Sequence, residues 1–371
     1  RYECKPVARA TDDREPRAWR ARIAGMTLTI ALDGMGGDDA PDIVVAGAAK
    51  ALTRTPDLRF LLTGDTARLE PLLTRHKGLA AATELRHTIA FVAADDRPSV
   101  ALRKGRDTSM RLAIDAVKAG AAAAAVSAGN TGALMAMAKF VLKTLPGIDR
   151  PAICGVWPAR SKSVVTLDLG ANVDCDSDHL VQFALMGAMF ARAILGVPTP
   201  SVGLLNVGTE ELKGDDTVRA AATVLKEIQG HFRFAGFIEG TDVARGTVDV
   251  VVTDGFTGNV ALKVAEGTAR MLMGELKAAF GSSWRGKLAW LVGGPAFQPM
   301  RDRFDPRHHN GAMFLGLNGV VVKSHGGTDA LGFANAIDVA ARFARERTNE
   351  RIIEELAQAQ SLLEPLAAAV S

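Results

Sequence analysis

Two short segments share the pattern S/T-x-G-x-T-G, and each follows an apolar run and precedes a helical pattern. They are residues 127–132 and 253–258. A third polar turn carries Lys323, Ser324 and His325, again directly after an apolar run. Hydroxyls, the free N–H groups of a helix start, an ammonium group and an imidazole together suit a small tetrahedral anion or a developing oxyanion. The residue types therefore predict a phosphate or oxyanion site, although an ordinary turn that binds nothing would use the same glycine and threonine.

Apolar runs alternate with helical patterns along the chain, and the polar turns follow the runs. We expect strands at 27–32, 59–62, 121–127, 164–169, 202–207, 248–253 and 319–322. Strands that alternate with helices predict an α/β fold, a doubly wound and mostly parallel sheet with helices on both faces. Ligands of such sheets bind beyond the carboxyl ends of the strands, which is where these turns would meet.

The composition is that of a globular chain with a basic start. Of its 371 residues, 48% are hydrophobic and 23% are charged. Residues 1–25 hold seven basic and four acidic residues and so have a net charge of +3. This equals the net charge of the whole chain, so residues 26–371 are neutral overall. We therefore expect a disordered tail at 1–25, a single catalytic unit at 26–371, and no nucleic-acid binding. Cys4, Cys154 and Cys175 lack metal-ligand spacing and indicate reduced thiols.

Other phosphate-binding motifs are missing or incomplete. The chain has no G-x-x-x-x-G-K-S/T loop for a nucleoside triphosphate. The turn at 34–39 begins like a dinucleotide fingerprint, but Asp39 stands where the third glycine should be, and acids would repel a pyrophosphate. Acidic turns could hold a divalent cation or could cap helices, and we expect no metal and no cofactor. The acids concerned are Asp33, Asp38, Asp39, Asp168, Asp174, Asp176 and Asp178.

Seven segments, in order along the chain, carry a family resemblance. They read LDGMGGDDAPD, VSAGNTGALMAMAKFVLKTLPGIDRPAI, LDLGANVDC, VQFALMGAMFARAILG, LLNVGTEELKG, DGFTGNVALKVAEG and LGLNGVVVKSHGGTDALGFANAI. Through them the chain resembles the bacterial acyl-carrier-protein:phosphate acyltransferases of phospholipid synthesis, the PlsX family, from about Met26 to the final helices. It departs from the family pattern at Gly34, Asp39 and Thr209, where alanine, histidine and an acid are expected. The first turn is therefore given no catalytic role.

This resemblance implies an activity, a fold and a set of partners. The family moves a long-chain acyl group from the thiol of acyl carrier protein to inorganic phosphate, without a cofactor. Its fold is similar to that of phosphotransacetylases and isocitrate-type dehydrogenases. It also implies a homodimer in the cytoplasm, peripherally bound to the inner face of the cell membrane. A downstream glycerol-3-phosphate acyltransferase is a further partner that the resemblance suggests.

The three polar turns then receive roles. Phosphate is already a nucleophile, so the protein needs mainly to position it and to stabilise the oxyanion on the thioester carbonyl. We expect Lys323 to neutralise phosphate charge, His325 to protonate the departing thiolate, and Asp168 to orient these groups. The predicted phosphate and oxyanion contacts are Ser127, Asn130, Thr131, Gly132, Asn172, Thr257, Gly258, Asn259 and Ser324. A covalent acyl-cysteine at Cys154 or Cys175 is the rival mechanism.

Two surface features could serve partners. The basic cluster Arg103, Lys104, Arg106 and Arg111 could receive an acidic carrier protein, or it could be a solvated helix end. A helical hairpin is expected at about 264–310. Its Trp284, Leu288 and Trp290 lie among basic residues and could enter a membrane interface, or the hairpin could pack in a dimer.

Two other function classes stay open from the sequence. One is an NAD(P)-dependent dehydrogenase on the related fold, against which the incomplete glycine fingerprint counts. The other is a non-catalytic membrane scaffold that recruits lipid enzymes. Phosphate-dependent release of free thiol distinguishes the acyltransferase from both.

Overall fold

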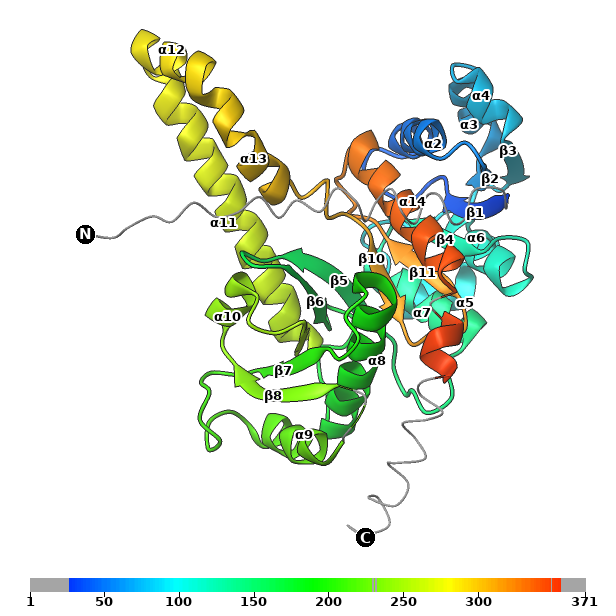
Figure 1. The fold of residues 1–371 in the computed structure, drawn as a ribbon. Helices are drawn as coiled ribbons and strands as arrows, with labels where there is room; N and C mark the ends of the chain where they lie inside the picture. The colour runs from blue at the N-terminus through cyan, green and yellow to red at the C-terminus, as the bar shows by residue number, and fades with distance from the viewer. Residues whose placement is uncertain (1–26, 229, 231, 348, 355–371) are drawn as a thin grey trace.

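One mixed sheet runs through the protein. The computed structural model describes residues 27–354, apart from 229, 231 and 348, so the predicted tail at 1–25 lies outside the described residues. Within that range eleven strands form one sheet in the order β3-β2-β1-β4-β11-β10-β5-β6-β9-β7-β8 (Figure 1). The strands are β1 (Leu28–Asp33), β2 (Leu58–Gly64), β3 (Thr83–His87), β4 (Ala124–Ser127), β5 (Ala152–Pro158), β6 (Ser163–Leu167), β7 (Ser201–Leu205), β8 (Arg233–Ile238), β9 (Val250–Val252), β10 (Ala312–Leu315) and β11 (Val320–Lys323).

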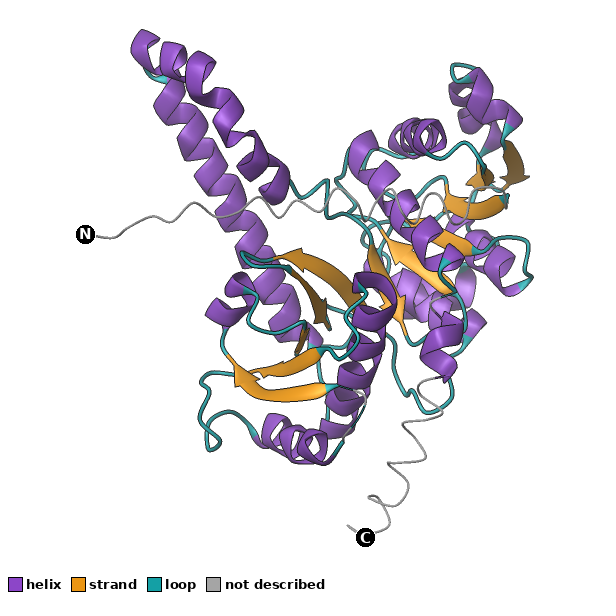
Figure 2. Cartoon of the chain, viewed as in Figure 1, coloured by secondary structure: helices purple, strands orange, loops and turns teal. Residues whose placement is uncertain are grey.

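Most neighbouring strands are parallel, which confirms the predicted fold class. One parallel half is β3-β2-β1-β4-β11, and the other is β6-β9-β7-β8. Between them β10 and β5 run antiparallel to both of their neighbours. The sequence analysis did not predict these two strands. The two halves are visible as separate groups of strands and helices in Figure 2.

Helices cover both faces of the sheet, and one of them is a core helix. The helices are α2 (Asp42–Arg54), α3 (Thr66–Leu73), α4 (Lys77–Ala81), α5 (Pro98–Lys104), α6 (Ser109–Lys118), α7 (Thr131–Leu142), α8 (Ser177–Leu195), α9 (Asp216–Glu227), α10 (Gly240–Arg245), α11 (Gly255–Gly281), α12 (Trp284–Gly293), η1 (Gly294–Phe297), α13 (Gln298–Phe304) and α14 (Ala330–Arg345). Among the described residues α8 alone has the length and composition to cross a membrane, but 72% of its apolar window is buried inside the protein. We therefore assign α8 to the core.

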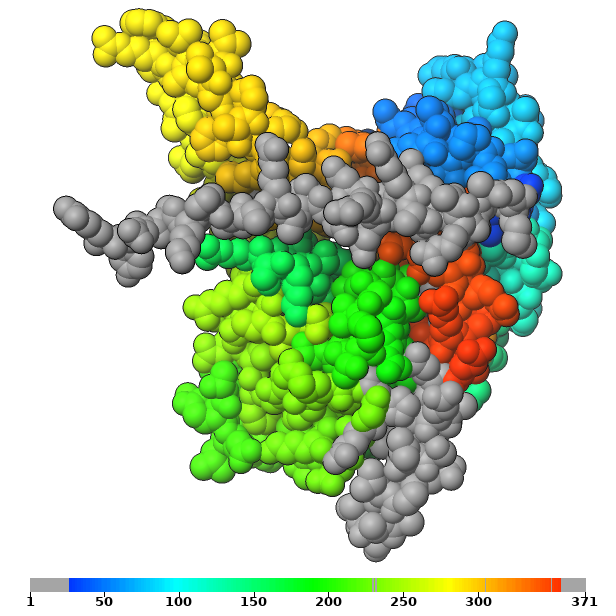
Figure 3. All heavy atoms as spheres, in the orientation of Figure 1, coloured from blue at the N-terminus to red at the C-terminus, as the bar shows by residue number. Residues whose placement is uncertain are grey.

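Helices α11 to α13 form a hairpin that projects from the body. Figures 1 and 3 show it as a separate yellow arm. Three aromatic rings hold its two sides together, because Phe280 lies 5.1 Å from Trp290 and 5.9 Å from Phe297, and Trp290 stacks on Phe297 at 5.8 Å. Trp284 and Leu288 are exposed, whereas Trp290 is half-buried within this cluster. The division into a tail and a single catalytic unit stays a prediction.

Candidate functional site

Three turns meet at the carboxyl ends of β1, β4 and β11, which are neighbours in the sheet. They follow Asp33, Ser127 and Lys323, the last residues of those strands. The first and third turns are joined by a hydrogen bond from the N–H of Asp38 to the carbonyl oxygen of Gly326, 3.1 Å long. The parallel pairing of β1, β4 and β11 thus gathers residues that are far apart in the chain at one edge of the sheet.

The first and second turns approach closely at Gly36. A Cβ added to Gly36 would lie 2.3 Å from the Asp33 carboxylate and 2.9 Å from the Gly129 nitrogen. Such distances leave no room for any side chain. Only a glycine therefore allows the turn after β1 to fold against the turn after β4.

The Ser127 turn begins α7, and Asn130 holds it in place. Asn130 is the N-cap, since its Oδ1 accepts the N–H of Ala133 at 3.0 Å. Its Nδ2 donates to the carbonyl oxygens of Ala94 at 2.8 Å and Asp96 at 3.0 Å. The polar atoms of the Asn130 side chain are thus all hydrogen-bonded within the protein. Thr131 and Gly132 lie in the first turn of the helix, where N–H groups have no intrahelical acceptor. N–H groups in this position can bind an anion.

The Ser127 hydroxyl also has its hydrogen bonds within the protein. Its Oγ donates to Oδ2 of Asp33 at 2.7 Å and accepts the N–H of Gly129 at 3.0 Å. Asp33 also accepts the hydroxyl of Ser109, at 2.6 Å. Asp33 and Ser109 were not among the predicted contacts. The clue in the sequence was a carboxylate at the end of a mostly apolar run, where a buried carboxylate needs hydrogen-bond donors.

The Lys323 ammonium group lies beneath the second and third turns. Its Nζ donates to the carbonyl oxygen of Ala128 at 3.2 Å and to that of Ser324. Burial lowers the pKa of Lys323 to about 8; the charges of Asp33 and Asp38 oppose that shift, and the charge of Lys263 adds to it. The ammonium form therefore predominates at neutral pH and gives the site a fixed positive charge.

Asn310 orders the remaining residues of the Lys323 turn. Its Nδ2 donates to Oγ of the fully buried Ser324 at 2.8 Å, and its Oδ1 accepts the N–H of His325 at 2.9 Å. Nδ1 of His325 accepts the N–H of Gly327 at 3.2 Å, so the neutral ring carries its proton on Nε2. Burial and the charge of Lys263 lower the pKa of His325. A neutral His325 ring suits the role of a hydrogen-bond donor, through Nε2–H, better than the predicted role of a general acid.

The second half of the sheet contributes the Asp168 turn. The buried carboxylate of Asp168 accepts five hydrogen bonds, from the N–H groups of Ile153, Gly170, Ala171 and Asn172 and from Nδ2 of Asn172, at 2.7–3.2 Å. Burial raises its pKa, and these donors oppose the rise. Asp168 and Asn172 therefore shape the turn, and the Asp168 carboxylate keeps no lone pair for a substrate. Its orienting role in the reaction stays a prediction.

The start of α11 packs on the Asp168 turn. The N–H of Gly255 donates to the carbonyl oxygen of Asn172 at 2.7 Å. A Cβ added to Gly258 would lie 1.9 Å from the carbonyl oxygen of Asp168. Thr257 is exposed, and its hydroxyl donates to its own helix cap, Asp254, at 2.7 Å. The structure thus brings Asp168 and Asn172 together with the first turn of α11.

Lys263 of α11 is a site residue that the sequence analysis missed. Its positive charge lowers the pKa of both Lys323 and His325. Glu266 holds it at 3.2 Å and also contacts Arg270, at 3.0 Å. A lysine in a helical pattern resembles any solvated helix face, so no local signal set Lys263 apart. Two ammonium groups at one edge of the sheet make the site suitable for an anion.

Neither predicted nucleophilic cysteine has an activated thiol. Cys154 is buried, and burial followed by the charge of Asp168 raises its pKa well above the usual value. The same two causes raise the pKa of Cys175 to about 11. The thiolate is the nucleophilic form, so both environments disfavour an acyl-cysteine. In the described part of the chain no three His, Cys, Asp or Glu side chains gather as metal ligands.

The predicted carrier-docking cluster lies around the end of α5 and the start of α6. Arg103 and Lys104 are in the last turn of α5, and both are exposed, as is Arg106. Arg111 is less available, because its Nε pairs with Asp115 at 3.0 Å and its guanidinium lies 5.6 Å from the ring centre of Phe140. Three of the four cations thus face solvent.

Comparisons with known proteins show the family and the fold of the chain. A family described as "Fatty acid synthesis protein" matches residues 28–351. A phosphate acyltransferase of Rhodospirillum centenum is 60% identical and covers 91% of this chain and 95% of the relative; one of Rhodospirillum rubrum is 54% identical and covers 91% and 96%. A phosphotransacetylase structure from Streptococcus pyogenes has a TM-score of 0.61 at 20% identity and covers 90% of this chain and 99% of its own. The EutD phosphotransacetylase from Staphylococcus aureus has a TM-score of 0.58 at 18% identity, with coverage of 88% and 97%.

Proposed function

We propose that this chain, which belongs to the fatty acid synthesis protein family together with the phosphate acyltransferases, moves a long-chain acyl group from the thioester of acyl carrier protein to inorganic phosphate. One observation carries the proposal. The Lys323 ammonium group donates to the carbonyl oxygen of Ala128 in the turn that begins α7, and the positive charge of Lys263 acts on it. A helix start and two cations are what a phosphate dianion requires.

The reaction needs positioning rather than a protein nucleophile. A phosphate oxygen attacks the thioester carbonyl carbon, the new C–O bond forms, and the C–S bond breaks to give acyl phosphate and the carrier thiolate. Lys323 and Lys263 hold the phosphate, and the N–H groups of Thr131 and Gly132 bind its oxygens. Nε2–H of His325 donates to the oxyanion that develops on the carbonyl oxygen. The thiolate takes its proton from solvent.

Acyl carrier protein is the proposed donor, and its docking surface is the exposed part of the basic cluster. Arg103, Lys104 and Arg106 carry three positive charges that an acidic partner can approach without displacing an existing ion pair. Arg111 is held by Asp115 and supports the surface from below. Surface charges of this kind speed association and make it depend on salt.

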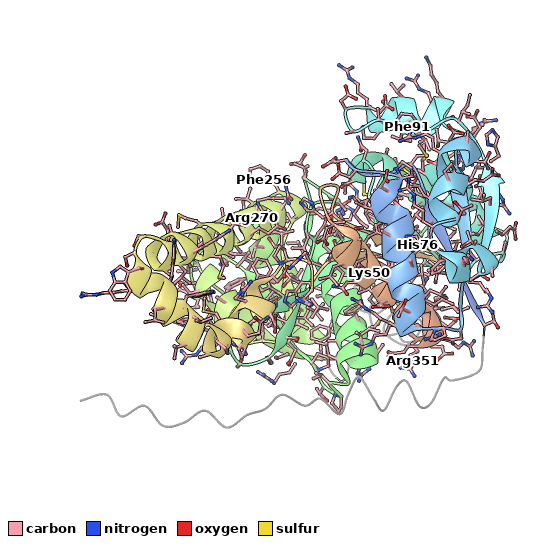
Figure 4. All side chains as sticks on the ribbon, turned by 90° about the horizontal axis from the view of Figure 1, so that it is seen from above. Lys50, His76, Phe91, Phe256, Arg270 and Arg351 are labelled. Atoms are coloured by element: carbon pink, nitrogen blue, oxygen red, sulfur yellow. The ribbon has the colours of Figure 1, made fainter. Side chains whose placement is uncertain are left out.

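We further propose that the tip of the hairpin binds a membrane and that α11 contacts a second copy of the chain. At its tip Trp284, Leu291 and Val292 are 71%, 76% and 78% exposed, beside Leu288, which suits a membrane interface at the cytoplasmic face. Along α11, Phe256, Val260, Val264 and Met271 recur at helical spacing and are exposed, which suits a homodimer contact. Figure 4 shows Phe256 on α11. Trp290 belongs to the aromatic cluster and is not part of the membrane surface. A downstream glycerol-3-phosphate acyltransferase could collect the product there.

The decisive experiment measures free thiol released from acyl carrier protein with and without phosphate, with hydroxylamine to trap acyl phosphate as hydroxamate. We expect release and hydroxamate only with phosphate. Equal thiol release without phosphate would show a thioesterase and overturn the proposal. Cys154→Ala and Cys175→Ala should keep the activity, and a loss in both would restore the acyl-cysteine mechanism.

A further inference from the structure

The carboxylate of Asp33 is buried beside the proposed phosphate turns, yet the reaction above gives it no part. Asp33 ends β1 and is 1% exposed. Its Oδ1 accepts the hydroxyl of Ser109 at 2.6 Å and the N–H of Met35 at 3.3 Å, and its Oδ2 accepts the hydroxyl of Ser127 at 2.7 Å. Every partner is a donor. Burial raises the pKa of Asp33, and these three donors and the charge of Lys323 oppose the rise.

A buried negative charge needs a compensating positive charge. The nearby positive charge is that of Lys323, which opposes the rise in the pKa of Asp33, and β1 and β11 both flank β4. The Lys323 ammonium group also donates to the carbonyl oxygen of Ala128, one residue beyond Ser127. The same buried carboxylate thus fixes the hydroxyl of the second turn and offsets the charge of the cation beneath it.

We infer that Asp33 is a positioning residue for the acceptor phosphate. It fixes the Ser127 turn, and the carbonyl oxygen of Ala128 in that turn accepts a hydrogen bond from the Lys323 ammonium group. The Ser127 hydroxyl gives its hydrogen to Asp33 and its lone pair to Gly129, so this hydroxyl shapes the turn and does not donate to phosphate. The inference rests on the proposed function, because it assumes that phosphate binds at this turn.

Asp33→Asn tests the inference, since it keeps the shape and removes the charge. We expect kcat/KM for phosphate to fall by about 10- to 100-fold, as for loss of a hydrogen-bonded charge. The readout that a structural role alone does not move is pH. The charged groups acting on Lys323 are Asp33, Asp38 and Lys263, and Lys323 in turn acts on His325. Because Asp33 raises the pKa of Lys323, the alkaline rise of KM for phosphate should move to lower pH in Asp33→Asn.

The chain contains a matched control far from the site. Asp249 accepts hydrogen bonds from the hydroxyl of Ser201 at 2.5 Å and from the ammonium group of Lys162 at 2.5 Å. Like Asp33, it is a carboxylate near a serine and a lysine, but it lies beside the start of β7. Asp249→Asn should lower the melting temperature and leave KM for phosphate and its pH dependence unchanged. Should Asp33→Asn fail to fold, the pair Ser109→Ala and Ser201→Ala replaces it, and only the first should lower kcat/KM, by about 3- to 10-fold.

Two outcomes overturn the inference. In one, Asp33→Asn keeps the wild-type KM and pH profile; in the other, the Ser109→Ala and Ser201→Ala variants behave alike. The proposed function has its own failure, in which wild-type protein releases thiol without phosphate. A phosphate-dependent wild type with an indifferent Asp33→Asn therefore refutes the positioning role alone.

Discussion

Replacing Gly258 by alanine should separate the start of α11 from the turn that it packs on. The added Cβ would lie 1.9 Å from the carbonyl oxygen of Asp168. Carbon–oxygen contacts are about 3.3 Å or longer, so the two backbone segments must move apart by more than about 1 Å. Both colliding atoms belong to fixed groups, a helix Cβ and a main-chain carbonyl, so no side chain can rotate away to relieve the contact.

The expected losses follow from that displacement. Overpacking costs about 1–3 kcal/mol, and a backbone collision belongs at the upper end, about 3 kcal/mol. At roughly 2–4 °C per kcal/mol for a chain of this order of size, the melting temperature should fall by about 6–12 °C. Because α11 also carries Lys263, a shift of about 1 Å should lower kcat/KM for phosphate by about 100-fold. Calorimetry and the phosphate-dependent thiol assay measure the two effects.

Gly78→Ala is the control, since Gly78 lies in helix α4 and nothing stands within 4 Å of an added Cβ. It should leave the melting temperature and the kinetics unchanged, or raise stability by up to about 1 kcal/mol. If Gly258→Ala melts within about 1 °C of the wild type and turns over normally, the contact between α11 and the Asp168 turn does not support the site, and the reasoning is wrong.

Three further predictions concern the cation, the cap and the hairpin. KM for phosphate should rise above about pH 8, because Lys323 loses its proton there. In Lys323→Met this pH dependence should vanish, and kcat/KM should fall by about 100-fold. An unchanged pH profile in the variant would contradict the role of Lys323. Asn130→Ala should lower the free energy of unfolding by about 1–3 kcal/mol in denaturant titrations, since a cap and two carbonyl contacts are lost; a variant as stable as wild type refutes this. Trp284→Ser should weaken flotation with anionic vesicles while thiol release in solution persists. Trp290→Ser should instead make the hairpin more sensitive to limited proteolysis. Equal flotation of wild type and Trp284→Ser would contradict the membrane role of the tip.

The sequence predicted the turns because their signals are local. A strand followed by S/T-x-G-x-T-G and a helical pattern fixes a turn at the carboxyl end of a strand, and parallel pairing brings such turns together. The partners of the turn residues were not local. Asp33 and Ser127 are 94 residues apart, and the choice of Asp33 as acceptor depends on β1 and β4 being neighbours.

The hairpin shows the same limit. Tryptophans in an amphipathic pattern predicted an apolar surface, and Trp284 is exposed as that surface requires. The pattern could not show that Trp290 would meet Phe280 and Phe297, since helix η1 returns the chain to that position. In the same way β5 and β10 were missed, because short apolar runs with mixed polar neighbours do not distinguish a strand from a loop.

The position of β10 and β11 in the sheet has a consequence for synthesis. They are the last two strands in the described part of the chain, yet they occupy the middle of the sheet, between β4 and β5. On the ribosome, both halves therefore wait with an unpaired central edge until residue 323 has emerged. Lys323 arrives with that closing strand, so the nascent chain gains its binding charge only when the sheet closes. Incomplete chains would thus expose unpaired strand edges, which favour aggregation, before they gain any activity.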